Sequence, residues 1–210
     1  MLHYWGMAVA IVLTEPGDPG DLRMIEIPDP EPGPGEVVVA VAASTVNPVD
    51  RGAVFTGYGE KMPGAAPWVL GWDAAGTVTA VGEGADPALA GRPVLAFSQW
   101  FKGGPGLQRS AVALPADAVA PAGDAIPPAE LTTFGLNGLT ALQALDAAGL
   151  GAGDSVLVLG ASGGVGGFVA ELAAHRGIAV LRGGRSTPPA DFAGMELDGL
   201  ICTAPIDPTA

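Results

Sequence analysis

The residues of this sequence that are best suited to chemistry form a glycine-rich segment at 160–167, Gly-Ala-Ser-Gly-Gly-Val-Gly-Gly. An unbroken apolar run at 154–159 precedes it, and residues 165–176 have the composition of a helix. Glycines let a strand turn sharply into a helix, and the first N–H groups of that helix attract an anion. The pattern predicts a dinucleotide pyrophosphate site formed by Gly160, Ser162, Gly163, Gly164, Val165 and Gly166. The alternative is a tight turn that serves packing alone.

Cationic and hydroxyl side chains follow the next expected strand, at 178–181. Arg182, Arg185 and Ser186 lie in this segment, and no carboxylate occurs before Asp191. In an NAD site the second strand ends in an acidic residue that binds the ribose 2′-hydroxyl, whereas a 2′-phosphate requires cationic donors. The segment therefore favours NADPH over NADH as the cofactor. The alternative is that both arginines are ordinary solvated charges.

Two groups of elements must position these residues. Short strands are expected at 8–13, 23–27, 36–44, 76–81, 92–97 and 110–114. Their spacing, with proline and glycine turns between them, predicts a small barrel or sandwich. Helical composition at 128–134 and 138–148, then strand, helix, strand and a last strand at 197–203, predicts a βαβ unit in a parallel sheet. We expect the sheet order second–first–last, and two domains, 1–122 and 123–210.

Charge and hydropathy exclude several partners. The formal net charge is −13, so a nucleic acid backbone or an anionic membrane would be repelled. No apolar run approaches the roughly 20 residues that span a bilayer. The first 14 residues lack the basic start of a signal peptide and are expected to form a strand. We therefore expect a cytoplasmic protein without nucleic acid or membrane partners.

Cysteine and histidine are too scarce for a typical zinc site. The sequence has one cysteine, Cys202, and its two histidines, His3 and His175, lie far apart. One thiol can neither form an intramolecular disulfide nor supply a multi-cysteine zinc site. Because Cys202 falls within an apolar run, it is expected to be a buried, inert thiol.

Several short segments occur in an order typical of one family. They include Pro32-Gly-Pro-Gly-Glu-Val-Val-Val, Asn47-Pro-Val-Asp, Val69-Leu-Gly-Trp-Asp-Ala-Ala-Gly-Thr-Val, Gly138-Leu-Thr-Ala-Leu and the glycine-rich segment. Together they resemble the zinc-free quinone oxidoreductases and enoyl reductases of the medium-chain dehydrogenase/reductase superfamily. The resemblance implies an α/β protein in which a GroES-like β-barrel precedes a Rossmann-like domain, with the active site between them. It also implies hydride transfer from NADPH to an enone, a quinone or an enoyl thioester.

The resemblance assigns roles to individual residues. Asn47 and Asp50 would line the active site near the nicotinamide, Tyr58 would donate to the substrate carbonyl, and Thr140 would lie near the cofactor. Zinc-binding relatives have their ligands where this chain has Val46-Asn47 and Trp72-Asp73, so the resemblance implies no catalytic metal. Each role has a simpler alternative, since Asn47 could only form a turn, Asp50 could cap a helix and Tyr58 could be an exposed loop residue.

The family pattern continues beyond the segments found here, so we expect a shortened Rossmann-like sheet with exposed edges. A homodimer, or a separate polypeptide, would cover those edges.

The sequence supports three possible functions, in decreasing order of support. The first is an NADPH-dependent reductase of an activated alkene or quinone, with a small apolar substrate. The second is a non-redox cyclase, isomerase or lyase in natural-product biosynthesis, which the apolar residues Phe55, Met62, Trp68, Trp72, Trp100 and Phe101 favour. The third is a non-catalytic binding subunit.

Overall fold

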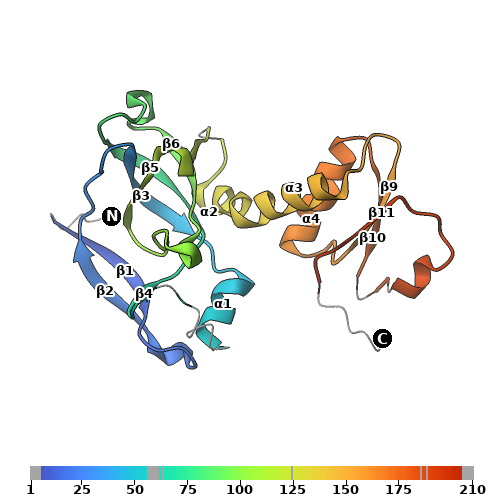
Figure 1. Ribbon diagram of the computed structural model, residues 1–210, viewed down its shortest axis with the longest axis horizontal. Coiled ribbons are helices and arrows are strands. Elements are labelled where there is room, and N and C mark those ends of the chain that lie inside the picture. Colours follow the sequence, from blue (N-terminus) through green and yellow to red (C-terminus); the bar gives the residue numbers. More distant parts are fainter. Residues whose placement is uncertain are drawn as a thin grey trace. The chain divides into compact units, whose positions relative to one another are not determined.

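The chain divides into two compact units, Met1–Gly135 and Leu136–Ala210. The structure is a computed structural model, and it describes residues 6–55, 62, 64–123, 125–184, 186–187 and 189–204. Figure 1 shows strands dominating the first unit and helices packed on a small sheet in the second. The sequence places a boundary at residue 122. The structure instead keeps α2 (Pro128–Leu131) in the first unit, because this helix packs on β3 (Glu36–Ser44) and β5 (Asp73–Val81).

The first unit is built from two antiparallel sheets. The larger sheet has the strand order β7-β3-β5-β6-β8, and the smaller has the order β2-β1-β4. The remaining strands are β1 (Met7–Leu13), β2 (Leu22–Pro28), β4 (Trp68–Val69), β6 (Pro93–Phe97), β7 (Ala111–Pro115) and β8 (Val119–Pro121). The core of the larger sheet consists mainly of β-branched side chains such as Val39, Val78 and Val112. This burial of alternating apolar residues confirms the predicted β-rich domain.

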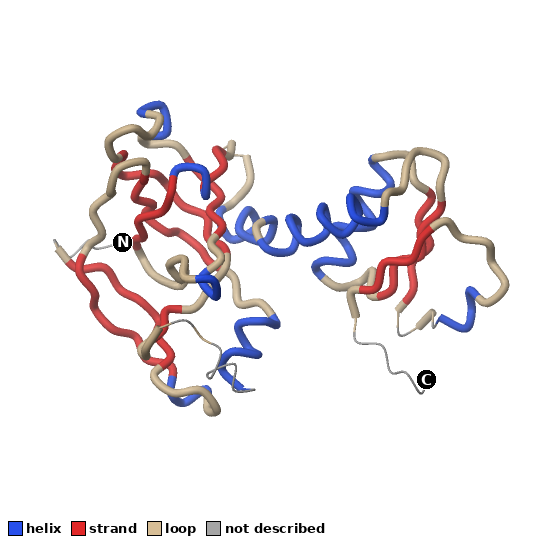
Figure 2. Tube along the Cα trace, viewed as in Figure 1, coloured by secondary structure: helices blue, strands red, loops and turns tan. Residues whose placement is uncertain are grey.

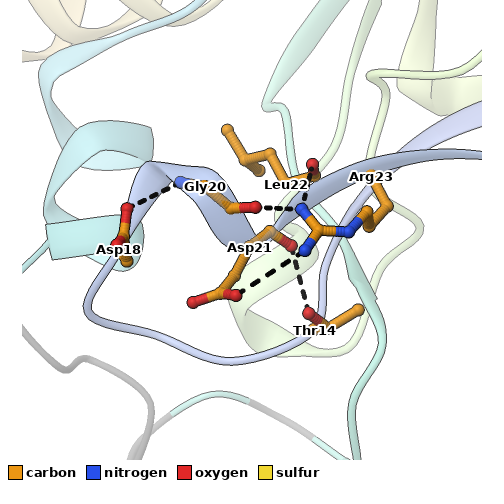
Figure 3. Close-up of polar contacts among 6 residues, drawn as sticks. All are labelled: Thr14, Asp18, Gly20, Asp21, Leu22 and Arg23. Atoms are coloured by element: carbon orange, nitrogen blue, oxygen red, sulfur yellow. Dashed lines mark hydrogen bonds and ion pairs between the residues drawn. The ribbon is translucent and has the colours of Figure 1, made fainter.

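A polar turn joins β1 to β2 and fixes their antiparallel register (Figure 3). The Thr14 backbone N–H donates to the Asp21 carbonyl oxygen at 3.3 Å, which closes the turn. The Asp18 carboxylate accepts the Gly20 N–H at 2.8 Å and caps the 3-10 helix between the strands. Arg23 lies 3.9 Å from Asp21 and donates to the Gly20 carbonyl oxygen. Side chains therefore satisfy backbone groups that this tight connection removes from the strand ladder.

The second unit is a parallel sheet covered by two helices. Its elements are α3 (Leu136–Ala148), β9 (Ser155–Leu159), α4 (Gly164–His175), β10 (Ala179–Gly183) and β11 (Gly199–Cys202). The strand order β10-β9-β11 confirms the predicted order second–first–last. The two helices pack on each other and on one face of the sheet, as the helices and strands of Figure 2 show. β9 is the central strand, and its residues 156–159 are all buried.

Cys202 is exposed, so the prediction of a buried thiol is wrong. The reason is the alternation of side chains along β11, which pairs with β9 along one edge. Ile201 points into the helix-covered core and is buried, whereas Leu200 on the opposite face is 60% exposed. Cys202 belongs to the same face as Leu200. An apolar run alone does not reveal that helices cover one side of the sheet more completely than the other.

Candidate active site

The glycine-rich segment forms the turn between β9 and α4. Gly160 leaves the strand with φ +83°, a left-handed conformation that favours glycine. A Cβ atom added to Gly166 would lie 2.2 Å from the Gly160 carbonyl oxygen. The start of α4 can therefore approach the turn this closely only with glycine at position 166. The local geometry is that of a strand–turn–helix unit, as the sequence predicts.

The first turn of α4 presents backbone N–H groups without a partner inside the helix. The Gly167 N–H donates to the Gly163 carbonyl oxygen at 2.8 Å, which is the first bond of the helical ladder. The N–H groups of Gly164, Val165 and Gly166 precede that bond, and Gly163 supplies no side-chain cap. Ser162, Gly163 and Gly164 are exposed. This end of the helix therefore suits an anion such as a pyrophosphate.

The end of β10 lies beside this turn, because the Gly160 N–H donates to the Gly183 carbonyl oxygen at 2.9 Å. Gly184 and Thr187 then exchange two backbone hydrogen bonds of 2.9 and 3.1 Å, which make a tight loop. Arg182 and Ser186 are exposed at this end of the strand. Arg185 falls outside the described residues. The structure thus brings the described members of the predicted 2′-phosphate site to the same edge of the sheet as the glycine turn.

Helix α3 contributes a residue that sequence reasoning missed. A Cβ atom added to Gly164 would lie 3.1 Å from Nδ2 of Asn137, so this amide lies against the start of α4. Thr140, which the resemblance places near the cofactor, is exposed one helical turn further along. Asn137 is a polar residue at the start of an apolar helix, and that position was the signal available in the sequence.

A second group of polar residues lies in the first unit, where α1 (Pro48–Phe55) begins. Asp50 Oδ2 accepts the backbone N–H of Asn47 at 2.8 Å, and both residues are buried. Asn47 precedes the helix and Pro48 is its first residue, so Asp50 closes the first turn as a capping side chain does. The capping role, one of the alternatives for Asp50, is therefore present in the structure.

Thr45 links Asn47 to a second buried carboxylate. Asn47 Nδ2 donates to Thr45 Oγ1 at 2.8 Å, and Thr45 Oγ1 donates to Asp73. Gln108 Nε2 donates to the Thr45 carbonyl oxygen at 3.3 Å. Because the asparagine NH₂ group can only donate, the threonine proton is committed to Asp73, which acts as an acceptor. Sequence reasoning noted Asp73 only as a replacement for a zinc ligand and missed Thr45 and Gln108.

Comparison with known proteins identifies the family behind this geometry. Residues 33–124 match the alcohol dehydrogenase GroES-like domain. The chain is 34% identical over 175 residues to the quinone oxidoreductase of Rattus norvegicus, and the match covers 82% of this chain and 51% of that protein. The chain belongs to the medium-chain dehydrogenase/reductase superfamily. The predicted α/β fold with a GroES-like domain is thereby confirmed.

Two further superfamily relatives show the extent of the match. A mycobacterial protein solved in complex with NADPH has a TM-score of 0.70 and 33% identity, covering 83% of this chain and 52% of that one. The chloroplast envelope quinone oxidoreductase homolog of Arabidopsis thaliana is 35% identical over 163 residues, which are 75% of this chain and 49% of that protein. The present chain thus spans about half the length of the quinone oxidoreductases that it matches.

In this superfamily member, the carboxyl group of Asp50 binds a proton unusually tightly. Burial raises the pKa of Asp50 from its ordinary value of 3.8 to about 6. The backbone N–H of Asn47 acts in the opposite direction, and the charge of Asp73 raises the pKa further. Desolvation disfavours the charged form of an acid, and a nearby carboxylate does the same. Asp50 is therefore able to exchange a proton near neutral pH.

Aromatic side chains surround the buried face of α1. Ala53 and Val54 on this helix pack with Leu70 and Trp100, and Trp72 lies against the same cluster. The rings of Trp72 and Trp100 have centroids 6.0 Å apart and are inclined at 65°. The Phe101 ring follows, 5.4 Å from Trp100. These side chains form an apolar, aromatic cluster that packs on α1, the helix of Asp50, and includes Trp72, the chain neighbour of Asp73.

The remaining predicted features of the site concern Tyr58, metals and membranes. Tyr58 lies outside the described residues. Within the described ranges, His, Cys, Asp and Glu side chains form no group of three that could hold a metal ion. Across the same residues, none of the helices has the length and hydropathy needed to cross a membrane.

Proposed function

We propose that this chain provides the cofactor site and part of the substrate site of an NADPH-dependent reductase of an activated alkene or quinone. The observation that carries the proposal is the first turn of α4, where the N–H groups of Gly164, Val165 and Gly166 have no partner in the helix and no side chain caps them. Such a turn at the carboxyl ends of parallel strands is the usual position of a dinucleotide pyrophosphate. The named relatives support the same assignment, because one is a quinone oxidoreductase and another was solved with NADPH.

Separate residues would hold the separate parts of the cofactor. The N–H groups of Gly164, Val165 and Gly166 would bind the pyrophosphate. Arg182, Arg185 and Ser186 would hold the 2′-phosphate, since guanidinium groups form bidentate hydrogen bonds to phosphate oxygens. Thr140 would lie further along towards the nicotinamide. The bound cofactor supplies the hydride, while the protein positions the reactants and supplies polar groups.

The direct test is titration of the purified protein with NADPH while nicotinamide fluorescence is followed. Saturable binding, with consumption of NADPH in the presence of an enone or quinone panel, is expected. Arg185→Glu should weaken NADPH by about 10-fold or more and NADH much less, because a charge reversal acts on the 2′-phosphate alone. Arg92→Glu, an exposed arginine of the first unit, is the matched control and should affect neither cofactor. Equal weakening of both cofactors by Arg185→Glu would contradict the assignment of the 2′-phosphate site.

A non-redox cyclase, isomerase or lyase is the second candidate. The aromatic cluster around Trp72 and Trp100 favours it, since such enzymes need a shaped apolar site more than a hydride donor. Absence of NADPH binding up to about millimolar concentration would support this candidate over the first. Tight binding without consumption of NADPH would instead indicate a binding or regulatory role.

A further inference from the structure

Two polar side chains from other elements lie against the glycines at the start of α4. The three nearest atoms to a Cβ atom added to Gly164 would all belong to the Asn137 amide group, with Nδ2 at 3.1 Å and Oδ1 at 3.5 Å. A Cβ atom added to Gly166 would lie 2.7 Å from Thr203 Oγ1. All four residues belong to the second compact unit, so both contacts are independent of where the first unit lies.

Only one of these two side chains still has a free hydrogen-bond donor. The hydroxyl group of Thr203 donates to the Leu159 carbonyl oxygen at 3.0 Å, which commits its single proton. The amide group of Asn137 makes no hydrogen bond to any residue that the structure describes. A primary amide carries two N–H donors. Beside the first turn of α4, Asn137 therefore has donors available for a bound molecule, and Thr203 has none.

Helix propensity and packing do not account for an asparagine at position 137. Asn137 is the second residue of α3, and asparagine is less favourable in a helix than alanine because its amide competes for backbone groups. The buried residues of the same helix, Ala141 and Leu145, are apolar. Asn137 is half-buried, and a half-buried amide without a partner loses part of its hydration. A ligand that accepts a hydrogen bond from the amide would offset this loss.

The neighbouring backbone groups determine what kind of ligand the amide would meet. The N–H groups of Gly164, Val165 and Gly166 precede the first bond of the helical ladder and carry the positive end of the helix dipole. An oxygen atom that accepts the Gly164 N–H lies about 2.9 Å from that nitrogen. Because the Asn137 amide lies against the same residue, its N–H groups can donate to the same oxygen anion. A neutral amide suits this position, whereas a carboxylate would repel the anion.

We propose that the Asn137 side chain donates a hydrogen bond to the cofactor pyrophosphate, so that α3 completes the anion site at the start of α4. The inference rests on the proposed reductase function, and it adds a side-chain donor from a second helix to the backbone donors of α4. NADPH and NADH share the pyrophosphate. Asn137 would therefore strengthen the binding of both cofactors equally, in contrast to Arg185, which would act on the 2′-phosphate alone.

Cofactor titration of two variants tests the proposal. Asn137→Ala removes the donor and should weaken NADPH and NADH by about 10-fold each, the effect of one lost hydrogen bond to a charged group. Asn137→Asp replaces the donor with a negative charge and should weaken both cofactors by about 100-fold or more. Gln143→Glu makes the same change from amide to acid at an exposed position of α3, and it should leave both affinities unchanged. Equal losses in Asn137→Asp and Gln143→Glu would overturn the proposal, because they would reflect the total charge alone.

Thermal unfolding separates a role in binding from a role in packing. Alanine is the better helix residue, so Asn137→Ala should keep or raise Tm while it weakens cofactor binding. A lower Tm with unchanged affinities would assign Asn137 to packing and overturn the proposal. If Tm and the affinities fall together, spectra of the natural side chain decide between the two roles.

Side-chain amide spectra report on the natural Asn137 without the complete cofactor. The sequence contains two asparagines and three glutamines, so a ¹H–¹⁵N spectrum holds five side-chain amide pairs, and the pair missing in Asn137→Ala belongs to Asn137. Inorganic pyrophosphate at about millimolar concentration should shift this pair and leave the Gln143 pair in place. Adenosine, which has no phosphate group, should leave both pairs in place. An Asn137 pair that pyrophosphate does not shift, or that adenosine shifts equally, would overturn the proposal.

The two titrations distinguish failure of this inference from failure of the proposed function. If the protein with Asn137 intact binds NADPH and Asn137→Asp binds it equally well, the inference is wrong and the reductase function stands. If the protein with Asn137 intact does not bind NADPH but pyrophosphate shifts the Asn137 pair, the reductase function is wrong and Asn137 remains part of an anion site.

Discussion

Asp50 is subject to two opposing influences. Its Oδ2 accepts the Asn47 N–H at the start of α1, an interaction that favours the ionised carboxylate. Burial favours the neutral acid and has the larger effect, so the pKa is raised to about 6. The result is a capping residue that can also carry a proton. Both alternatives for this residue, the helix cap and the active-site acid, are therefore compatible.

The raised pKa makes folding stability depend on pH in a defined direction. The folded state holds the Asp50 proton up to about pH 6, whereas the unfolded chain releases it near pH 3.8. The contribution of Asp50 to stability is therefore complete below pH 3.8 and lost as the pH rises through 6, by at most about 3 kcal/mol. Urea unfolding at pH 4 and pH 7.5 should show this loss in the natural protein, and Asp50→Asn should remove it. Asp117→Asn should retain the loss, and a pH dependence shared equally by all three proteins would contradict the assignment.

At the scale of elements, the glycines of the β9–α4 turn serve packing, and in the proposed function they would also bind the cofactor. Gly166 is required because its Cα lies against the turn, while the next residue, Gly167, has its nearest external atom 3.8 Å from an added Cβ. The two positions are adjacent on the same helix but differ in the space around them. They therefore form a natural pair for separating packing from helix propensity.

Gly166→Ala should destabilise the protein by about 1–3 kcal/mol, because its methyl group would overlap the Gly160 carbonyl oxygen. Gly167→Ala should instead stabilise it by roughly 0.5–1 kcal/mol, the usual gain in a helix. Thermal unfolding checks both signs. NADPH titration should show weaker binding only for Gly166→Ala, because that variant displaces the N–H groups of the first turn. Similar stability for the two variants would mean that the turn relaxes without cost.

At the scale of the whole molecule, the net negative charge and the exposed apolar side chains near β11 bear on which partners the protein can bind. The net charge of −13 opposes polyanions, so the proposed anionic cofactor would need locally arranged donors, such as the N–H groups of α4 and the Arg182 side chain. On β11 and the segment before it, Leu200 is 60% exposed and Met195 is 52% exposed. A second copy of the chain, the partner expected from the sequence, would bury such exposed apolar side chains.

The charge predicts the absence of nucleic acid binding at ordinary salt. Fluorescence anisotropy of a labelled duplex of about 20 base pairs should stay constant on addition of the protein at about 0.15 M salt. Lowering the salt should not produce binding, because the interaction is repulsive. Binding that strengthens as salt is lowered would show a basic surface that the net charge conceals.

Cys202 provides a probe for the homodimer expected from the sequence. The exposed thiol should react with a disulfide reagent in the native protein at low concentration. If a second copy covers the face that includes Leu200, the reaction should slow as protein concentration rises, and sedimentation should show twice the mass. Leu200→Lys should abolish both effects. A labelling rate independent of concentration, with monomeric mass throughout, would contradict a dimer through this face.

The sequence alone determined the features that depend on neighbours along the chain. The alternation of strands, the strand–glycine–helix unit at β9 and α4, and the order β10-β9-β11 all follow from local periodicity and short connections. The segments around Asn47, Trp72 and Gly138 also identified the family, because their order and spacing are read directly from the chain. The cofactor preference, the substrate and the roles of the named site residues remain predictions.

Only the tertiary structure decided which distant residues meet and which faces are covered. Thr45 and Asp73 are 28 residues apart, and Asn137 precedes Gly164 by a whole strand and turn, so no spacing in the sequence reveals either contact. Cys202 shows the same limit, since an apolar run does not indicate on which side the helices pack. The burial of the polar side chains of Asp50, Trp72 and Trp100 likewise follows from packing between elements. The burial and hydrogen bonding of a side chain depend on the elements that pack around it. These elements meet only when the chain has folded.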